Sequence, residues 1–239
     1  MIIVICQGHT GSRLLAQTLR ESGVWMGKPL NGMGDLVPEG WPRVEPPMYE
    51  AARICNQHVH PNGRYSWDFS FLLRSDPTDA WWAAVYDHIH TVVQAPEPSG
   101  WKLPETLFSL PWLVHRFPTA HYIHWTRDPR DVIGDRQVAN IHPYVGLPHR
   151  GSNDTYLHRA IGWKYQHDLV AVTPRPPYWL EVRFEDFVLH QERELSRLGT
   201  FLDLELATVE ARTEPVHRWR KEGREYAPEV LDLLRGGFS

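Results

Sequence analysis

MIIVICQGHTGSRLLAQTLR, residues 1–20, decides the fold class of this chain. Met1–Cys6 is an almost wholly apolar run, as expected for a buried strand, and Leu14–Arg20 has the pattern of a helix that stops at Gly23. The loop between them, Gln7–Arg13, contains two glycines. A strand, such a loop and a helix direct backbone N–H groups and a helix N-terminus at one point, which favours a bound phosphate or sulfate.

The same loop also has a simpler interpretation. It could be a tight turn between strand and helix, with Gly11 at positive φ and Ser12 as the N-cap of the helix. It lacks the GxxxxGK[ST] pattern, so an ordinary NTPase phosphate loop is not supported. Only other parts of the chain can decide between a turn and an anion site.

Length and composition predict one α/β domain over residues 1–239, with a loop-rich insertion at about residues 24–66. A hydrophobic fraction of 42% allows a sizeable core. The net charge of −4 argues against a protein that coats nucleic acid or an anionic membrane. We therefore expect a small-molecule partner, and neither a nucleic acid nor a membrane.

The two cysteines indicate a reducing compartment. Cys6 falls in the buried first strand, and we expect both it and Cys55 to be free thiols. No leader-like N-terminus is apparent, and no apolar stretch approaches the roughly 20 residues that span a bilayer. The expected location is cytoplasmic.

Strands and helices alternate along the rest of the chain. Strands are predicted at His121–Thr126 and Tyr178–Phe184. Helices are predicted at Pro47–Asn56, Asp76–Val93 (with Asp76 as N-cap), Glu105–Phe117, Pro129–Ala139, Asp154–Val172, Glu185–Leu202 and Pro228–Leu234. This alternation predicts a parallel sheet flanked by helices, in which ligands bind beyond the carboxyl ends of the strands. The first loop, the segment after Thr126 and the end of the Phe184 strand should then share one edge.

Three separated segments resemble the sulfotransferases that use 3′-phosphoadenosine 5′-phosphosulfate (PAPS). They are the N-terminal loop, Lys102-Leu103-Pro104 followed by FPTAHYIHWTRDPRDV at residues 117–132, and VRFED at residues 182–186. The family shows a glycine loop, K-x-P, FP-x-A-x-x-I-x-x-x-RDPRDV and V-R-Y-E-D in this order. The chain resembles a divergent, bacterial-type member of that family, with its P-loop-like α/β fold.

The resemblance implies a donor site and a role for several residues. Arg127 would hold the 3′-phosphate of PAPS, Phe184 would pack on the adenine, and Lys102 would lie near the transferring sulfuryl group. No metal is implied. The loop that would cradle the 5′-phosphosulfate consists of Gly8, His9, Thr10, Gly11, Ser12, Arg13 and Leu14.

The chain departs from the family pattern at three places. His9 stands where the family has Arg or Lys, and Arg13 could compensate for it. Asp135 stands where the family has a serine ligand of the 3′-phosphate, so Arg130 or Arg136 would have to take over, unless the motif is aligned differently or the donor is altered. The C-terminal R-K-G loop of the family is replaced by a run of similar composition. Its candidates for the 3′-phosphate are Arg218, Arg220 and Lys221, and the alternative interpretation of the run is a solvated basic turn.

A general base must take the proton of the acceptor. The candidates are Asp35, Glu105 and the pair His58 and His60. His9, Lys102, Asp35 and Glu105 thus form the predicted catalytic set. Glu185 and Asp186 read as structural caps of a helix.

The predicted function is transfer of a sulfuryl group from PAPS to a hydroxyl or amine of a small-molecule or carbohydrate acceptor. One alternative is a catalytically degenerate protein that binds adenosine bisphosphate, since His9 and Asp135 would then mark lost catalysis. The other is an ATP-dependent small-molecule kinase, which the missing GK[ST] disfavours. An aromatic wall for a sugar or a phenol would comprise Trp41, Tyr49, Tyr65 and Trp67.

Overall fold

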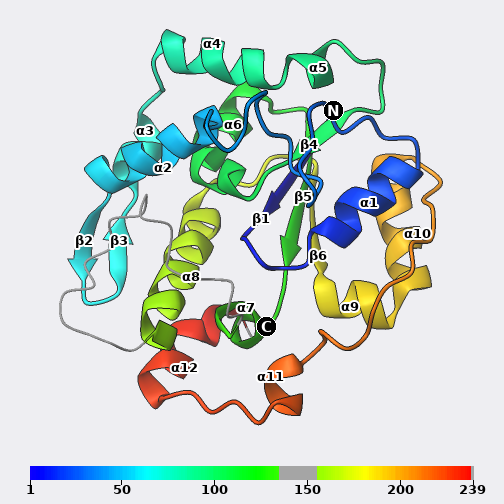
Figure 1. Cartoon of the computed structure of the whole chain (residues 1–239). Helices are drawn as coiled ribbons and strands as arrows, with labels where there is room; N and C mark the ends of the chain where they lie inside the picture. Colours follow the sequence, from blue (N-terminus) through cyan, green and yellow to red (C-terminus); the bar gives the residue numbers. More distant parts are fainter. Residues whose placement is uncertain (135–154, 238–239) are drawn as a thin grey trace.

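A parallel four-stranded sheet organises the computed structural model, which describes residues 1–134 and 155–237. The strands lie in the order β4 (Gly100–Lys102), β1 (Ile2–Cys6), β5 (His121–Thr126) and β6 (Trp179–Arg183), and every pairing is parallel. The predicted α/β class and parallel sheet are confirmed. The carboxyl ends of the strands therefore share one edge (Figure 1).

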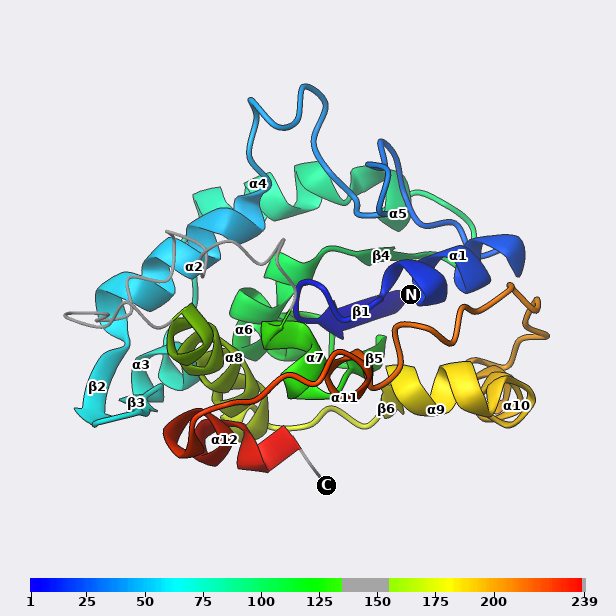
Figure 2. The same cartoon turned by 60° about the horizontal axis from the view of Figure 1, so that its bottom comes forward.

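Helices cover both faces of this sheet. Successive side chains along β1 point to opposite faces, and on each face they enter a separate apolar cluster. Ile3 and Ile5 pack in one cluster, while Ile2, Val4 and Cys6 pack in the other. The second face carries α1 (Arg13–Glu21), α9 (Phe184–Leu189) and α10 (Gln191–Leu202), as Figure 2 shows.

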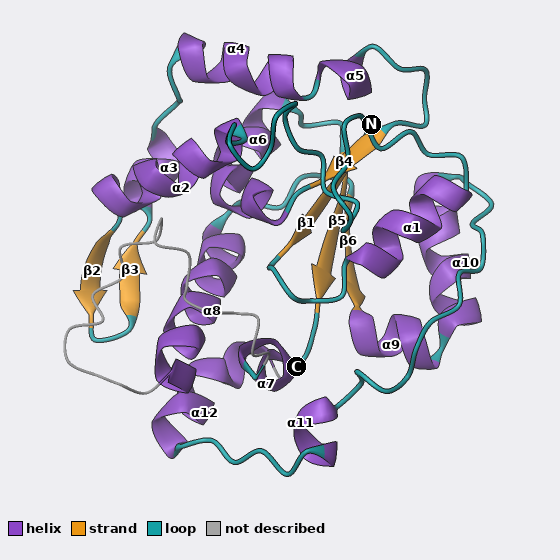
Figure 3. Cartoon of the chain, viewed as in Figure 1, coloured by secondary structure: helices purple, strands orange, loops and turns teal. Residues whose placement is uncertain are grey.

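The larger cluster lies on the opposite face. It is covered by α2 (Pro47–His58), α3 (Ser70–Arg74), α4 (Asp79–His88), α5 (His90–Val93), η1 (Pro104–Ser109), α6 (Leu110–Arg116), α8 (Thr155–Val172) and α12 (Pro228–Leu234). The remaining short elements are α7 (Pro129–Ile133), α11 (Arg218–Lys221), η2 (Arg235–Gly237) and a hairpin of β2 (His60–Gly63) and β3 (Ser66–Asp68) (Figure 3). No helix in the described ranges is long and apolar enough to cross a membrane.

Several predicted helices are wrong in extent. The helix predicted from Asp76 begins at Asp79 instead, because the side chain of Thr78 accepts a hydrogen bond from the Trp81 N–H and caps it. It is interrupted at Ile89, whose backbone is not helical. The helix predicted over residues 185–202 is likewise two helices, separated at His190.

Other local predictions also need correction. The stretch predicted as one helix from Glu105 begins as a 3-10 turn and becomes α-helical only at Leu110. Ser12 occupies the N-cap position of α1, but its side chain makes no capping hydrogen bond. Strand β4, the hairpin β2–β3 and α11 were not predicted. The predicted helix Pro129–Ala139 ends in the described residues at Ile133, and Ala139 and Asp135 lie outside them.

Candidate functional site

The loop after β1 has the backbone of an anion-binding turn. His9 and Gly11 adopt left-handed conformations, with φ of 62° and 79°. Such alternation of backbone conformation directs successive N–H groups toward one point, and the loop leads directly into the N-terminus of α1. The Thr10 hydroxyl donates to the Gln7 carbonyl at 2.8 Å and braces the turn from within.

A glycine is required at position 11 by packing as well as by φ. A Cβ there would lie 2.8 Å from two carbons of the Phe184 ring. Phe184 is itself buried, and its ring also lies 4.7 Å from the guanidinium of Arg127. The predicted adenine contact of Phe184 remains a prediction. In this structure the Phe184 ring packs against the loop at Gly11.

Arg127 connects the loop to the end of β5. Its Nη1 donates to the His9 carbonyl at 3.3 Å, and its Nη2 donates to the Pro215 carbonyl at 2.6 Å and lies 3.4 Å from Asp131 Oδ2. The side chain is buried, and its Nε has no hydrogen-bond partner among the described residues. Two segments about 118 positions apart in sequence are therefore in direct contact, as the shared sheet edge predicted.

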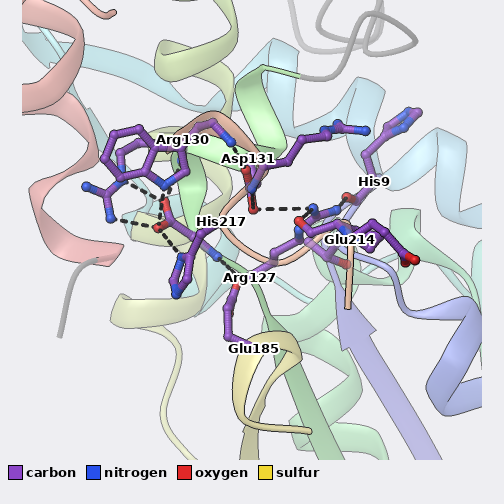
Figure 4. A network of polar contacts seen from close by, with 12 residues as sticks. His9, Arg127, Arg130, Asp131, Glu185, Glu214 and His217 are labelled. Carbon is purple, nitrogen blue, oxygen red and sulfur yellow. Dashed lines mark hydrogen bonds and ion pairs between the residues drawn. The ribbon is translucent and has the colours of Figure 1, made fainter. Parts of the chain in front are cut away.

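The two aspartates of the RDPRD segment hold the C-terminal run against this edge (Figure 4). Asp131 accepts hydrogen bonds from the backbone N–H groups of Arg218 and Trp219. Asp128 accepts from Arg130 Nη2 at 2.6 Å and from Trp219 Nε1 at 3.2 Å. Burial opposes ionisation of Asp128, but the hydrogen bonds from Arg130 outweigh it and lower the pKa of this carboxyl.

Glu185 lies in the first turn of α9 and also makes a structural contact outside that helix. Its Oε1 accepts a hydrogen bond from the backbone N–H of Asp128 at 2.9 Å. The carboxyl therefore joins the end of β6 to the end of β5. Burial raises its pKa.

A second polar cluster lies at the ends of β1 and β4. Lys102 Nζ lies 2.5 Å from Asp35 Oδ1 and donates to the Met33 carbonyl at 2.9 Å. Asn31 closes the turn that carries Met33 and Asp35. Its Nδ2 donates to Asp35 Oδ2, and its Oδ1 accepts from the backbone N–H groups of Met33 and Asp35. Lys102 and Asp35 are both buried, so the ion pair is shielded from solvent.

Glu105 belongs to the same cluster. Burial raises its pKa to about 7, and the negative charge of Asp35 acts in the same direction. Lys102 and a hydrogen bond from the Tyr49 side chain lower the pKa, but they do not outweigh burial. A carboxyl with a pKa near neutrality can exchange a proton at physiological pH, as a general base must.

The remaining predicted residues are distributed less tightly. His9 and Arg13 are exposed, and Leu14 is half-buried. Arg13 Nη2 lies against the Met33 sulfur, which places it between the loop and the Asn31–Asp35 turn. In the C-terminal run Arg218 is half-buried, whereas Arg220 and Lys221 are exposed.

Most of the histidine pair and of the proposed aromatic wall lies at the hairpin and its neighbouring helices. The His58 ring stacks on Phe71 of α3 at 4.0 Å, and His60 begins strand β2 of the hairpin. Tyr65 donates to Glu229 of α12, and Trp67 packs edge-on against Tyr165 of α8. Of the four aromatic residues, only Tyr49 contacts the Glu105 cluster in the described contacts.

Sequence reasoning missed two residues that shape the site. Asp131 was read only as part of the RDPRD motif, and Trp219 as part of a basic run. A carboxylate that follows an arginine by four positions at a helix start was an available signal for an internal ion pair. The contact to Trp219 had no such signal, because it joins residues 88 positions apart.

Comparison with known proteins agrees with this geometry. A family model described as "Sulfotransferase family" matches residues 2–208. Among solved structures, the chain resembles a "Sulfotransferase Domain from the Curacin Biosynthetic Pathway", with a TM-score of 0.51, 18% identity, and coverage of 98% of this chain and 77% of that one. No curated protein sequence matches significantly. At 18% identity the likeness in structure shows the fold, whereas the family match spans most of the sequence. The chain belongs to the sulfotransferase family.

Proposed function

We propose that the protein transfers a sulfuryl group from PAPS to a hydroxyl or amine of a small-molecule or carbohydrate acceptor. The observation that carries this proposal is the direct contact of the loop after β1 with Arg127, which places an anion-binding turn beside a buried guanidinium. A donor with two separate anionic groups requires two such features at one edge. We also propose that the protein acts in the cytoplasm, without a nucleic-acid, membrane or metal partner.

The residues present fit this donor. The turn from Gly8 to Ser12 offers backbone N–H groups for a phosphosulfate. Arg127 has a buried Nε without a hydrogen-bond partner in the described part of the chain, and a planar guanidinium suits a phosphate. When bound, PAPS supplies the sulfuryl group, whose bond to the 5′-phosphate oxygen breaks as the acceptor oxygen or nitrogen bonds to sulfur, leaving adenosine 3′,5′-bisphosphate.

The chain's own residues would supply charge and take up a proton. Lys102 carries a buried positive charge at the end of β4, which would offset negative charge that develops at the sheet edge. Glu105 is favoured over Asp35 as the general base. Asp35 is held in an ion pair with Lys102, whereas the pKa of Glu105 is about 7, so its ionised form can accept a proton from the acceptor near neutral pH.

The first experiment is binding of adenosine 3′,5′-bisphosphate, measured by calorimetry and thermal unfolding, with adenosine 5′-phosphate and ATP in parallel and no added metal. A ligand at 100 times its Kd stabilises the folded state by about 2.7 kcal/mol, so binding should raise the Tm clearly. We expect the bisphosphate to bind most tightly. Arg127→Ala should weaken it by about 10- to 100-fold, as expected for loss of a charged hydrogen bond. Arg193→Ala, which changes an exposed side chain on α10, is the matched control and should have no effect.

The remaining outcomes distinguish the alternatives. Binding of the bisphosphate without sulfuryl transfer to any hydroxyl or amine acceptor from labelled PAPS would favour a catalytically degenerate protein. A preference for ATP, or no binding of any of the three nucleotides, would refute the donor site while leaving the fold intact.

A further inference from the structure

A short segment after α10 lies directly over Arg127. We call residues Pro215–Trp219 the strap. The Pro215 carbonyl accepts a hydrogen bond from Arg127 Nη2 at 2.6 Å, which is shorter than the contacts of this guanidinium with the His9 carbonyl and with Asp131. Two residues further on, His217 has φ of 50° and ψ of 38°, a backbone conformation that costs free energy in a residue with a Cβ. The strap is therefore held in place by contacts that outweigh this cost.

Asp131 supplies those contacts on one side. Its carboxylate is fully buried, and an isolated charge at such a position would be strongly unfavourable. Oδ1 accepts from the Trp219 N–H at 2.8 Å, and Oδ2 accepts from the Arg218 N–H at 3.3 Å. The same Oδ2 lies 3.4 Å from Arg127 Nη2. One buried carboxylate thus satisfies both the strap backbone and the arginine.

Asp128 fixes the strap from the neighbouring position. It accepts from Trp219 Nε1 at 3.2 Å, and its Oδ2 lies 3.7 Å from His217 Nδ1. The indole of Trp219 also packs under the guanidinium of Arg130, at 4.0 Å from the ring centroid. The Trp219 end of the strap therefore has several independent polar anchors. At the Pro215 end the polar contact is the carbonyl bond to Arg127, and the neighbouring Val216 side chain is buried in the second apolar cluster.

A neutral carbonyl is a weaker partner for a guanidinium than an anion is. A guanidinium and a phosphate can pair through two parallel hydrogen bonds, which add energy and geometric specificity that a single carbonyl oxygen cannot supply. Arg127 additionally has a buried Nε without a hydrogen-bond partner in the described ranges. A phosphate could satisfy that N–H and replace the Pro215 carbonyl at Nη2, while Asp131 keeps the arginine and the Trp219 end of the strap together.

We propose that Asp131 is a positioning residue for the anion site, and that the Pro215 carbonyl occupies the place of a phosphate oxygen until the ligand displaces it. This inference deepens the proposed function and rests on it for the identity of the ligand, the 3′-phosphate of the donor. The strap would then act as a latch. Its Pro215 end exchanges with the phosphate, and its Trp219 end remains anchored and keeps Arg218 at the same edge.

The test compares Asp131→Asn with wild type by nucleotide affinity. In wild type, the ratio of the Kd for adenosine 5′-phosphate to the Kd for adenosine 3′,5′-bisphosphate measures recognition of the 3′-phosphate. We expect Asp131→Asn to lower this ratio at least tenfold and to change the Kd for adenosine 5′-phosphate by less than threefold. An equal loss for both nucleotides would show a merely structural role and overturn the proposal. Asp168→Asn, which removes an ion pair with Lys164 on α8, is the matched control and should leave the ratio unchanged.

Hydrogen–deuterium exchange tests the latch without relying on the donor. In the free protein, Asp131→Asn should accelerate exchange of the Arg218 and Trp219 amides at least tenfold and leave the amides of α8 unchanged. If neither nucleotide binds wild type, the proposed donor is wrong, yet this measurement still decides whether Asp131 holds the strap. Unchanged exchange of these two amides would overturn the proposal.

Two further measurements complete the test. Adenosine 3′,5′-bisphosphate should change strap exchange in wild type by more than twofold relative to adenosine 5′-phosphate, since only the former displaces the Pro215 carbonyl. Identical exchange with both bound nucleotides would refute the displacement. If Asp131→Asn does not fold, Trp219→Phe is the second variant. It removes the hydrogen bond to Asp128 and weakens the packing of the ring on Arg130 and Arg220. It should accelerate strap exchange at least threefold and lower the affinity ratio, and no change in either would overturn the proposal.

Discussion

Replacing Glu105 by glutamine should change how the stability of the protein depends on pH. Burial raises the pKa of Glu105 from 4.5 to about 7 in the folded protein. Below pH 4.5 the carboxyl is protonated in both folded and unfolded chains. Between pH 4.5 and 7 the unfolded chain loses this proton while the folded chain keeps it, so the free energy of unfolding falls as pH rises. Above pH 7 the loss is complete and constant.

The size of the effect follows from the two pKa values. At about 1.4 kcal/mol for each pKa unit, a rise from 4.5 to about 7 corresponds to about 3 kcal/mol of stability, as an order of magnitude. Glu105→Gln keeps the shape of the side chain but cannot ionise. Relative to wild type, the variant should therefore gain up to about 3 kcal/mol of unfolding free energy between pH 4.5 and pH 8.

Urea unfolding of both proteins at pH 5, 6, 7 and 8 measures this difference. Glu192→Gln, an exposed position on α10, is the matched control, and its difference from wild type should stay nearly constant with pH. A difference between Glu105→Gln and wild type that is also independent of pH would refute the reasoning, because the carboxyl would then titrate alike in both states. If Glu105 is also the base, kcat/KM of wild type should rise with pH through about 7, and the variant should lose this rise together with most of its activity.

Three further predictions concern single positions. Lys102→Met leaves the buried Asp35 carboxylate without its ion-pair partner. Chemical unfolding should show that the free energy of unfolding falls by about 3–5 kcal/mol, and sulfuryl transfer should be lost. A fall of less than about 1 kcal/mol would contradict a buried ion pair. Gly11→Ala should lower the free energy of unfolding by more than about 1 kcal/mol, because φ is positive there and the new Cβ would lie 2.8 Å from carbons of the Phe184 ring. Gly8→Ala is the control and should lower it by less, since open space surrounds that position. Equal losses for the two variants would contradict this packing. Cys6 and Cys55 have pKa values raised by burial to about 11 and about 12, so neither should react with iodoacetamide at pH 8 until the protein is unfolded, and rapid alkylation of the native protein would disprove this.

Local pattern in the sequence determined the parallel sheet, the glycine-containing turn after its first strand and their common edge. The signals were the apolar run before Gln7, the glycine at position 11 and the RDPRD segment after a second apolar run. Each involves residues that are close in sequence, so each can be interpreted without knowing the tertiary contacts. Helix ends were predicted less well, since the choice of Thr78 over Asp76 as a cap depends on which side chain reaches an N–H group.

Tertiary structure alone decided how the site works. The ionisation of Glu105 depends on burial and on the charges of Asp35 and Lys102, which lie far apart in sequence and act together only after folding. The contact of Asp131 with the strap, and the position of Phe184 beneath the turn, arise in the same way. Sequence specifies residue types and their spacing. Desolvation and long-range hydrogen bonds exist only in the packed molecule, so its pKa values and the contacts of its strap could not be derived from sequence.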